Sequence, residues 1–205
     1  MSNLAVEKKY SLEEYVEMEV ASEERLEFYD GYVWSMAGAS PGHETIVVNM
    51  STALTNQLRG RSCRTFSSNL RLKVPEYPPY RYPDLSALCG EPIYEEIEGL
   101  QMLVNPNLIV EVLSKSTAEF DRGDKFTYYK SIESFTEYLL ISQDRPNVIH
   151  YIKQDEKTWL QREYNDIEET FYLESLDCEI SLKDIYLNIK FKPPEKPKHP
   201  LEIIR

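Results

Sequence analysis

The chain has 205 residues, of which 41% are hydrophobic and only 7 are glycine, so it holds enough apolar material for a folded core. No apolar run approaches the ~20 residues that span a bilayer, and we expect a soluble, cytoplasmic protein with no membrane attachment. The net charge of -12 argues against a nucleic-acid-binding surface, which is usually basic. Much of the acid is concentrated in segments 91–98, 155–156 and 163–169, so a local basic patch can coexist with this net charge.

The first third of the chain predicts a short helix, a hairpin and a long helix. Ser11-Leu-Glu-Glu14 is a capping box that begins the short helix. Asp30-Gly31 supplies the turn of a hairpin over residues 26–37, because both residue types tolerate the positive φ of a tight turn. The long helix runs from about His43 to Arg59, where apolar residues follow the 3.6-residue period.

The rest of the chain is dominated by strands. An acidic loop separates the second strand from the third, and a second capping box, Ser116-Thr-Ala-Glu119, begins a helix that reaches about Ser131. Strands are expected near residues 63–74, 82–88, 108–113, 138–142, 148–153 and 158–164, followed by a strand with a short helix over 173–186. We therefore predict an α+β (mixed α/β) fold, a central mixed sheet flanked by helices, as a single domain over 1–191 with a Pro- and Lys-rich tail over 192–205.

The three cysteines, Cys63, Cys89 and Cys178, are odd in number and widely spaced. None belongs to a Cys-x-x-Cys pair or has a nearby histidine, so neither a disulfide framework nor a structural zinc site is predicted. We expect small, inert core residues.

Two acidic residues interrupt apolar strands. Glu111 lies in the middle of Leu108-Ile-Val-Glu-Val-Leu113, where it shares a face with Ile109 and Leu113. Burial of an unpaired carboxylate costs several kcal/mol unless a cation or hydrogen bonds compensate. Asp84 repeats the pattern after Pro83, and if the two strands pair, the two carboxylates form an all-oxygen site suited to Mg²⁺ or Mn²⁺.

A lysine is placed to reach these acids. Asp121 and Lys125 are four residues apart on the helix that follows the Glu111 strand, so they share a helix face. Beside metal-bound carboxylates, a lysine can orient the attacking water, help to deprotonate it, or neutralise charge on a phosphate. These are the parts of a phosphodiester hydrolase.

Each residue also has a simpler interpretation. Glu111 alone can pair with a core arginine or lysine, and Asp84 after a proline can be a turn residue. Asp121 and Lys125 can form only a surface ion pair, worth about 0.3–0.5 kcal/mol. The combination favours the metal site.

Five segments together carry a family resemblance, and they extend over about residues 10 to 190: Arg25-Leu-Glu-Phe-Tyr-Asp-Gly31, Gly42-His43, Pro83-Asp84, Ile109-Val-Glu-Val-Leu-Ser-Lys-Ser-Thr117 and Asp121-Arg-Gly-Asp-Lys-Phe-Thr-Tyr-Tyr129. The sequence resembles the Uma-two family of restriction-endonuclease-like proteins. That resemblance implies the PD-(D/E)XK nuclease fold and a Mg²⁺-dependent attack on DNA phosphodiester bonds.

The resemblance also assigns roles to residues. It makes Asp84 and Glu111 the two metal-binding acids, with the carbonyl of Val112 as a further ligand and Glu27 as an additional acid near the metal. The superfamily lysine, two residues after the second acid, is replaced here by Leu113, so Lys125 is its natural substitute. An exposed strand residue is the alternative for Glu27.

His43 shares its helix stripe with apolar residues, so we expect a half-buried histidine, and a role near the site is the less favoured alternative.

The sequence thus predicts an endonuclease that uses Mg²⁺ (or Mn²⁺) to hydrolyse DNA, with Asp84, Glu111, Lys125 and Glu27 as catalytic residues and Asp84, Glu111 and Val112 as metal ligands. The alternative is a catalytically silent protein of the same fold that acts as a homodimeric binding or assembly module, which the acidic charge favours. A homodimer is expected in either case. A third interpretation is a metal-dependent hydrolase of a smaller phosphate ester.

Overall fold

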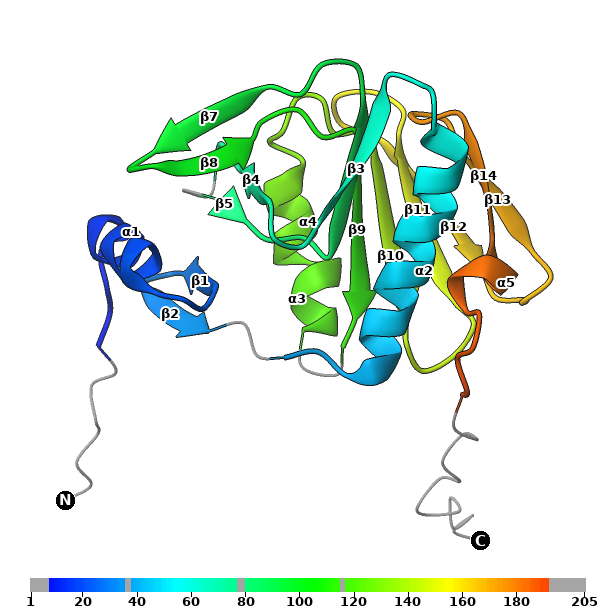
Figure 1. Ribbon diagram of the computed structural model, residues 1–205, viewed down its shortest axis with the longest axis horizontal. Helices are drawn as coiled ribbons and strands as arrows, with labels where there is room; N and C mark the ends of the chain where they lie inside the picture. Colours follow the sequence, from blue (N-terminus) through cyan, green and yellow to red (C-terminus); the bar gives the residue numbers. More distant parts are fainter. Residues whose placement is uncertain (1–7, 36–37, 77–79, 115–116, 192–205) are drawn as a thin grey trace, which may run out of the picture.

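A six-stranded mixed sheet forms the centre of the protein in the computed structural model, which describes residues 8–35, 38–76, 80–114 and 117–191. The strand order is β12 (Trp159–Tyr164), β11 (Val148–Lys153), β10 (Glu137–Ser142), β9 (Leu108–Leu113), β6 (Leu85–Cys89) and β3 (Cys63–Ser67). β9 and β10 run parallel, and the other neighbours in this sheet run antiparallel (Figure 1). The predicted α+β fold with a central mixed sheet is confirmed. The predicted tail, 192–205, lies outside the described residues.

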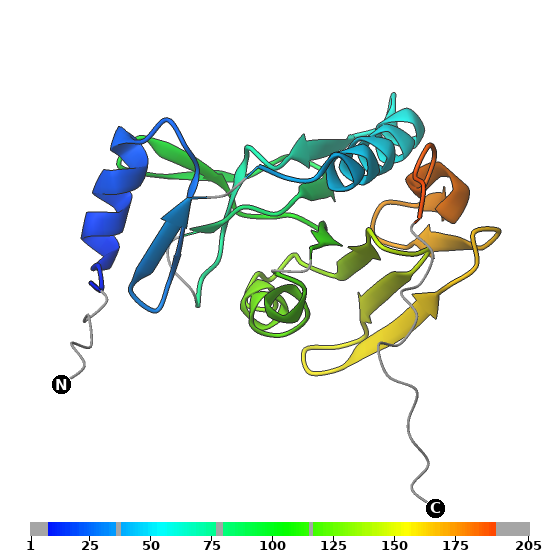
Figure 2. The same ribbon diagram turned by 90° about the horizontal axis from the view of Figure 1, so that it is seen from below.

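Helices cover both faces of this sheet (Figure 2). One face packs against α2 (Pro41–Leu58), α5 (Leu182–Ile185) and the hairpin of β13 (Thr170–Leu173) and β14 (Cys178–Ser181). The other face packs against α4 (Asp124–Tyr129), which follows α3 (Ala118–Arg122). β9 is therefore buried on both sides, which explains its continuous apolar sequence. Within the described residues, no helix has the length and apolarity that crossing a membrane requires.

A second, four-stranded sheet lies beside the N-terminal elements. Its order is β5 (Tyr80–Arg81), β4 (Arg71–Lys73), β8 (Leu100–Leu103) and β7 (Tyr94–Ile97). The helix α1 (Leu12–Ala21) and the hairpin of β1 (Leu26–Tyr29) and β2 (Tyr32–Ser35) pack here around a small core of Tyr15, Val16, Tyr80, Tyr82 and Met102. Glu27 of β1 lines the same cavity as Glu111 and Val112 of the large sheet.

Several local predictions are confirmed. Ser11 and Glu14 form the reciprocal hydrogen bonds of a capping box at α1. Asp30 and Gly31 have φ values of 47° and 85°, the left-handed geometry that the hairpin turn requires. The hairpin ends at Ser35, and residues 36–37 lie outside the described residues.

Three predictions about elements are wrong. The strand predicted over 63–74 is two strands, β3 and β4, which belong to different sheets. The acidic loop is instead the hairpin β7–β8, which the sequence hides because every residue of β7 is exposed and no apolar alternation results. The helix predicted over 116–131 is two short helices, because the backbone leaves helical geometry at Gly123, whose ψ is -96°. Ser116 lies outside the described residues, and α3 begins after Thr117, whose side chain makes no cap bond.

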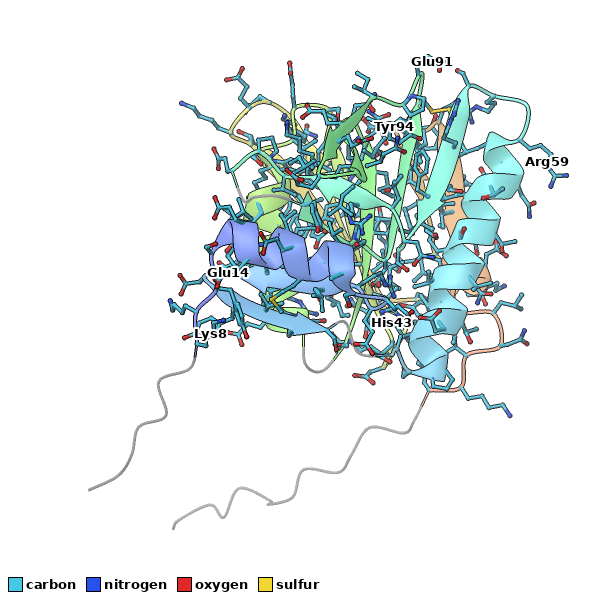
Figure 3. The ribbon with its side chains drawn as sticks, turned by 60° about the vertical axis from the view of Figure 1, so that its left-hand side comes forward. Lys8, Glu14, His43, Arg59, Glu91 and Tyr94 are labelled. Carbon is cyan, nitrogen blue, oxygen red and sulfur yellow. A yellow bond between two sulfur atoms is a disulfide. The ribbon has the colours of Figure 1, made fainter. Side chains whose placement is uncertain are left out.

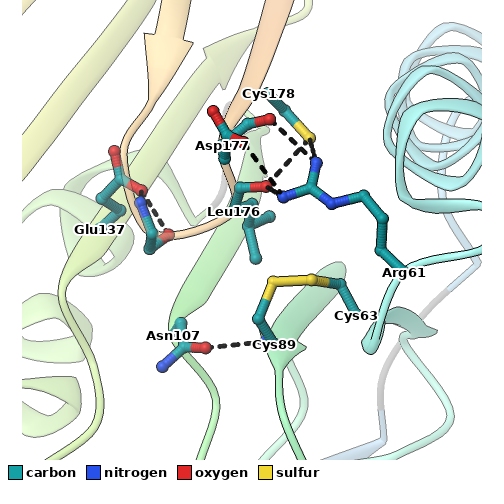
Figure 4. The surroundings of a disulfide bond; sticks show 9 residues. Arg61, Cys63, Cys89, Asn107, Glu137, Leu176, Asp177 and Cys178 are labelled. Carbon is teal, nitrogen blue, oxygen red and sulfur yellow. Dashed lines mark hydrogen bonds and ion pairs between the residues drawn. A yellow bond between two sulfur atoms is a disulfide. The ribbon is translucent and has the colours of Figure 1, made fainter.

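The cysteine prediction is also wrong in part, because Cys63 and Cys89 form a disulfide (Figure 4). The two residues are 26 positions apart in sequence, but they face each other as register partners on the antiparallel strands β3 and β6, with Cα atoms 3.9 Å apart. That proximity depends on strand pairing and cannot be read from spacing. Cys178 is a free, buried core residue, as predicted.

Candidate active site

The predicted site residues line one cavity of about 900 Å³, which is partly open to solvent. It lies where the end of β9, the bend before β6, the helices α3 and α4, the first turn of α2 and the β1–β2 hairpin meet. Its lining includes all the acids that the sequence singled out, together with the predicted lysine: Glu27, Asp84, Glu111, Asp121 and Lys125. Segments that are far apart in sequence are thus brought together by the fold.

Glu111 projects from β9 into this cavity, with its side chain only 4% exposed. Its Oε1 accepts hydrogen bonds from Lys125 Nζ and the Tyr129 hydroxyl, each at 2.8 Å. Its Oε2 has a long contact, 3.4 Å, with the backbone N–H of Asp84. Burial raises the pKa of Glu111 well above its ordinary value, and the charges of Asp84 and Asp121 add to this rise while Lys125 opposes it.

Asp84 lies at the bend that precedes β6, not inside the strand as predicted. Its Oδ2 accepts a hydrogen bond of 2.7 Å from the backbone N–H of Val112 on the neighbouring β9. The pairing of β6 with β9 therefore fixes the two acids beside each other. Val112 also lines the cavity, and the part played by its carbonyl as a metal ligand stays a prediction.

Lys125 is buried between acids, with its side chain 7% exposed. Its Nζ lies 2.8 Å from Glu111 Oε1 and 3.5 Å from Asp121 Oδ1. Burial alone would lower the pKa of Lys125, but the charges of Glu111, Glu27 and Asp121 raise it well above the ordinary value. The surface ion pair considered for Asp121 and Lys125 is wrong, since both are buried, whereas Glu111 does pair with a core lysine.

Glu27 is buried as well, with 9% of its surface exposed, so the exposed-strand alternative is wrong. It comes from β1 and lies close enough to Lys125 and Tyr129 for its charge to act on both. Its Oε1 is buried and has no hydrogen-bond partner among the described residues. Such an oxygen is costly unless a cation or an ordered water compensates it, so Glu27 Oε1 is a candidate cation ligand.

Two further residues hold the acids in place. His43 lies near the N-terminal end of α2 (Figure 3), and its Nε2 is 3.1 Å from Asp84 Oδ2. The half-buried state predicted for His43 is confirmed, and its contact with Asp84 places it beside the candidate acids, where a role for it stays a prediction. Burial lowers the pKa of His43, but Asp84 and Glu44 raise it above the ordinary value overall. Tyr129 on α4 is the second of these residues, since its hydroxyl donates a hydrogen bond to Glu111 Oε1, and the sequence had included it only as part of the family motif.

The donor set fits a hard divalent cation. Among the carboxylate oxygens of the cavity, Glu27 Oε1 has no hydrogen-bond partner among the described residues, the contacts of Asp84 engage Oδ2, and Glu111 Oε2 has only the long contact with Asp84. The described residues that line the cavity include five acids (Glu27, Glu44, Asp84, Glu111, Asp121), one arginine (Arg25), one lysine (Lys125) and His43. Oxygen ligands and excess negative charge are what Mg²⁺ and Mn²⁺ require. No group of three or more His, Cys, Asp or Glu residues within the described ranges is already close enough to hold an ion.

Comparisons with known proteins agree with this fold. The model of the Uma2 family, described as "Putative restriction endonuclease", matches residues 12–185. The uncharacterized protein slr1290 of Synechocystis sp. (strain ATCC 27184 / PCC 6803 / Kazusa) is 33% identical over 89% of this chain and 94% of its own length. The uncharacterized protein sll1609 of the same organism is 38% identical over 80% of this chain and 92% of its own length.

A solved structure resembles the whole arrangement. The crystal structure of a "putative nuclease belonging to DUF820" from Anabaena variabilis ATCC 29413 superposes with a TM-score of 0.69 and 18% sequence identity. The similarity covers 86% of this chain and 97% of that one. At this level of identity the likeness establishes the fold.

Proposed function

The chain belongs to the Uma2 family of restriction-endonuclease-like proteins, and from that premise we propose that it is a metal-dependent endonuclease that hydrolyses DNA phosphodiester bonds. The observation that carries the proposal is the buried Oε1 of Glu27, which has no hydrogen-bond partner among the described residues and lies in the cavity that also holds Asp84 and Glu111. Lys125 pairs with Glu111, and His43 contacts Asp84, but neither of these contacts supplies a partner for Glu27 Oε1. The cytoplasmic location and the homodimer stay predictions.

We propose that Asp84 and Glu111 hold Mg²⁺ or Mn²⁺, with Glu27 assisting directly or through water and the carbonyl of Val112 as an additional oxygen. When bound, the ion supplies charge neutralisation, polarisation of the phosphate and a lower pKa for the attacking water. The hydrogen bond of Val112 and the contact of His43 both engage Oδ2 of Asp84, which leaves Oδ1 available. Likewise, Tyr129 and Lys125 engage Oε1 of Glu111 and leave Oε2 toward Asp84.

Lys125 then acts on the phosphate or on the water. Its ammonium is kept charged by Glu111 and Asp121, so it is a fixed positive charge at the wall of the cavity. A charge held in a site that excludes water stabilises negative charge that develops on a phosphate more strongly than a mobile surface lysine does. Its donors can also orient the water, and in both roles Lys125 replaces the superfamily lysine for which the chain has Leu113.

Cleavage of supercoiled and linear DNA tests the proposal. The purified protein should nick or cut DNA with Mg²⁺ or Mn²⁺ and lose this activity in chelator. Asp84→Ala and Glu111→Gln should each lower the rate by about 100-fold or more, the scale of one lost electrostatic contact in a transition state. The exposed Glu168→Gln is the matched control and should cut as the wild type does.

Activity that persists in both Asp84→Ala and Glu111→Gln contradicts this assignment. A folded protein that neither cuts DNA nor binds Mn²⁺ in a calorimetric titration contradicts it too, and such a result selects the silent binding module instead. Cleavage of small phosphate esters without cleavage of DNA selects the third interpretation.

A further inference from the structure

We propose that Trp34 is the stacking platform of a nucleobase subsite next to the carboxylates, so that the strand on which the protein acts is unpaired where it enters the cavity. This inference rests on the proposed function, because it names the form of DNA that the same site takes. It adds a residue and a substrate class that the acids alone do not specify.

The register of the β1–β2 hairpin places Trp34 beside the acids. Trp34 is the direct cross-strand partner of Glu27, so the two side chains lie on one face of the hairpin, with Cβ atoms about 5 Å apart. The neighbouring pair, Phe28 and Val33, belongs to the opposite face and packs toward α1, where Phe28 stacks on Tyr15. The face that carries Glu27 and Trp34 is therefore the one that lines the cavity.

Burial falls sharply along this face. Glu27 is 9% exposed, whereas Trp34 is 40% exposed although it lines the same cavity. The only other tryptophan, Trp159, has a structural environment, with ring contacts to Phe126 and Phe135 at 5.2 Å. Trp34 instead presents a partly exposed aromatic side chain in the lining of the cavity, directly across the hairpin from a proposed metal-binding acid.

The charges of the cavity favour an unpaired strand over an intact duplex. The described lining residues include one lysine and one arginine: Lys125 is already paired with Glu111 and Asp121, and Arg25 donates hydrogen bonds of 2.9 Å to the carbonyl and the hydroxyl of Ser68. Proteins that bind duplex DNA gain most of their affinity from many phosphate contacts, which these described residues do not offer. Stacking of a base on an aromatic ring does not depend on such contacts.

A base can reach the indole of Trp34 only when it has left its own stack. Enzymes that act on single strands or on extruded nucleotides use aromatic side chains in this way. Polar side chains that line the same cavity, which include Ser35, Ser68 and Arg25, can meet the edge of such a base or its phosphate. The adjacent phosphate then lies toward Glu27 and the other acids.

The test compares two strands that differ only in their bases. A short oligothymidine and the same backbone with abasic residues are titrated in chelator, so that no cleavage occurs, and binding is followed by anisotropy of a dye on the DNA. In the wild type the bases should increase affinity by roughly 5- to 150-fold, the effect of stacking one base on an aromatic side chain. In Trp34→Ala this ratio should fall to about one, and Trp34→Phe should restore part of it.

Tryptophan fluorescence gives a second readout of the same binding. Oligothymidine should quench the emission of the wild type, and this quenching should disappear in Trp34→Phe, which keeps Trp159. The matched control is Tyr172→Ala, an aromatic residue on β13 with 48% exposure that does not line the cavity, and it should bind both strands as the wild type does. Thermal unfolding establishes that each variant is folded.

Equal affinity of the wild type for the two strands overturns the proposal, and so does an undiminished preference for bases in Trp34→Ala. Tighter binding of a fully paired duplex than of the single strand also overturns it. The outcome is separate from that of the cleavage assay, because binding is measured without metal. A protein that stacks bases but never cuts loses the proposed activity and keeps this subsite.

Discussion

Replacement of Lys125 by methionine tests whether the cavity carries excess negative charge. The substitution keeps an unbranched side chain of similar length but removes the ammonium that lies 2.8 Å from Glu111 Oε1. Both side chains are almost fully buried, so Glu111 is left as an uncompensated charge beside Glu27. Loss of one member of a buried ion pair costs about 3–5 kcal/mol of unfolding free energy.

Urea unfolding with and without Mg²⁺ measures this cost. Without metal, Lys125→Met should lose about 3–5 kcal/mol, and the double variant Lys125→Met/Glu111→Gln should recover much of it, because no charge is then left unpaired. Mg²⁺ should stabilise Lys125→Met more than the wild type, since a cation can take the place of the ammonium. The exposed pair of Lys183 and Glu168 is the control, and Lys183→Met should cost at most about 1 kcal/mol.

The reasoning is refuted if Lys125→Met is as stable as Lys183→Met. It is also refuted if Mg²⁺ stabilises the wild type and Lys125→Met equally.

The remaining predictions concern other groups of the molecule. His43→Ala should weaken Mn²⁺ binding, measured by calorimetry, by about 10- to 100-fold, because His43 contacts Asp84. His43→Gln keeps an N–H donor and should recover part of the lost affinity. Equal Mn²⁺ affinity of the wild type and His43→Ala would contradict the role of His43 in positioning Asp84. Burial opposes ionisation of Glu137, but hydrogen bonds from its partners hold its pKa below the ordinary 4.5. The ionised Glu137 therefore stabilises the folded protein fully above pH 4.5, and this contribution is lost as the pH falls through the lowered pKa. Stability curves of the wild type should therefore decline below pH 4.5 more steeply than those of Glu137→Gln, and parallel curves would contradict this. Reduction of the Cys63–Cys89 disulfide, which has a sequence separation of 26, should lower the unfolding free energy by about 3–4 kcal/mol, and an unchanged urea midpoint would contradict it.

The large sheet and its main helices were accessible from the sequence because their residues follow simple periods. β9 was predicted with its observed bounds, since a strand buried on both faces is continuously apolar. The hairpin β7–β8 was not, because a strand that is exposed on both sides carries no such pattern. The disulfide between Cys63 and Cys89 was missed for a related reason, as it depends on which strands become neighbours.

The candidate site follows the same division. Glu111 was recognisable as an acid in an apolar strand, and the structure places Lys125 directly against it, although the predicted helix is broken at Gly123, between Asp121 and Lys125. The burial of Glu27 and the contact between His43 and Asp84 depend on the packing of the β1–β2 hairpin and of α2 against the sheet. No local pattern in the sequence encodes those contacts, so the residues that surround Glu27 and Asp84 could be identified only from the folded structure.

A crystal structure of the protein grown with Mn²⁺, with diffraction data collected at the manganese absorption edge, tests the central claim most directly. The account predicts an anomalous peak in the cavity, within about 2.0–2.4 Å of carboxylate oxygens of Asp84 and Glu111, with Glu27 Oε1 turned toward the ion directly or through water. No peak in the cavity at saturating Mn²⁺, or a peak held by other residues while the Glu111–Lys125 ion pair is unchanged, would contradict it.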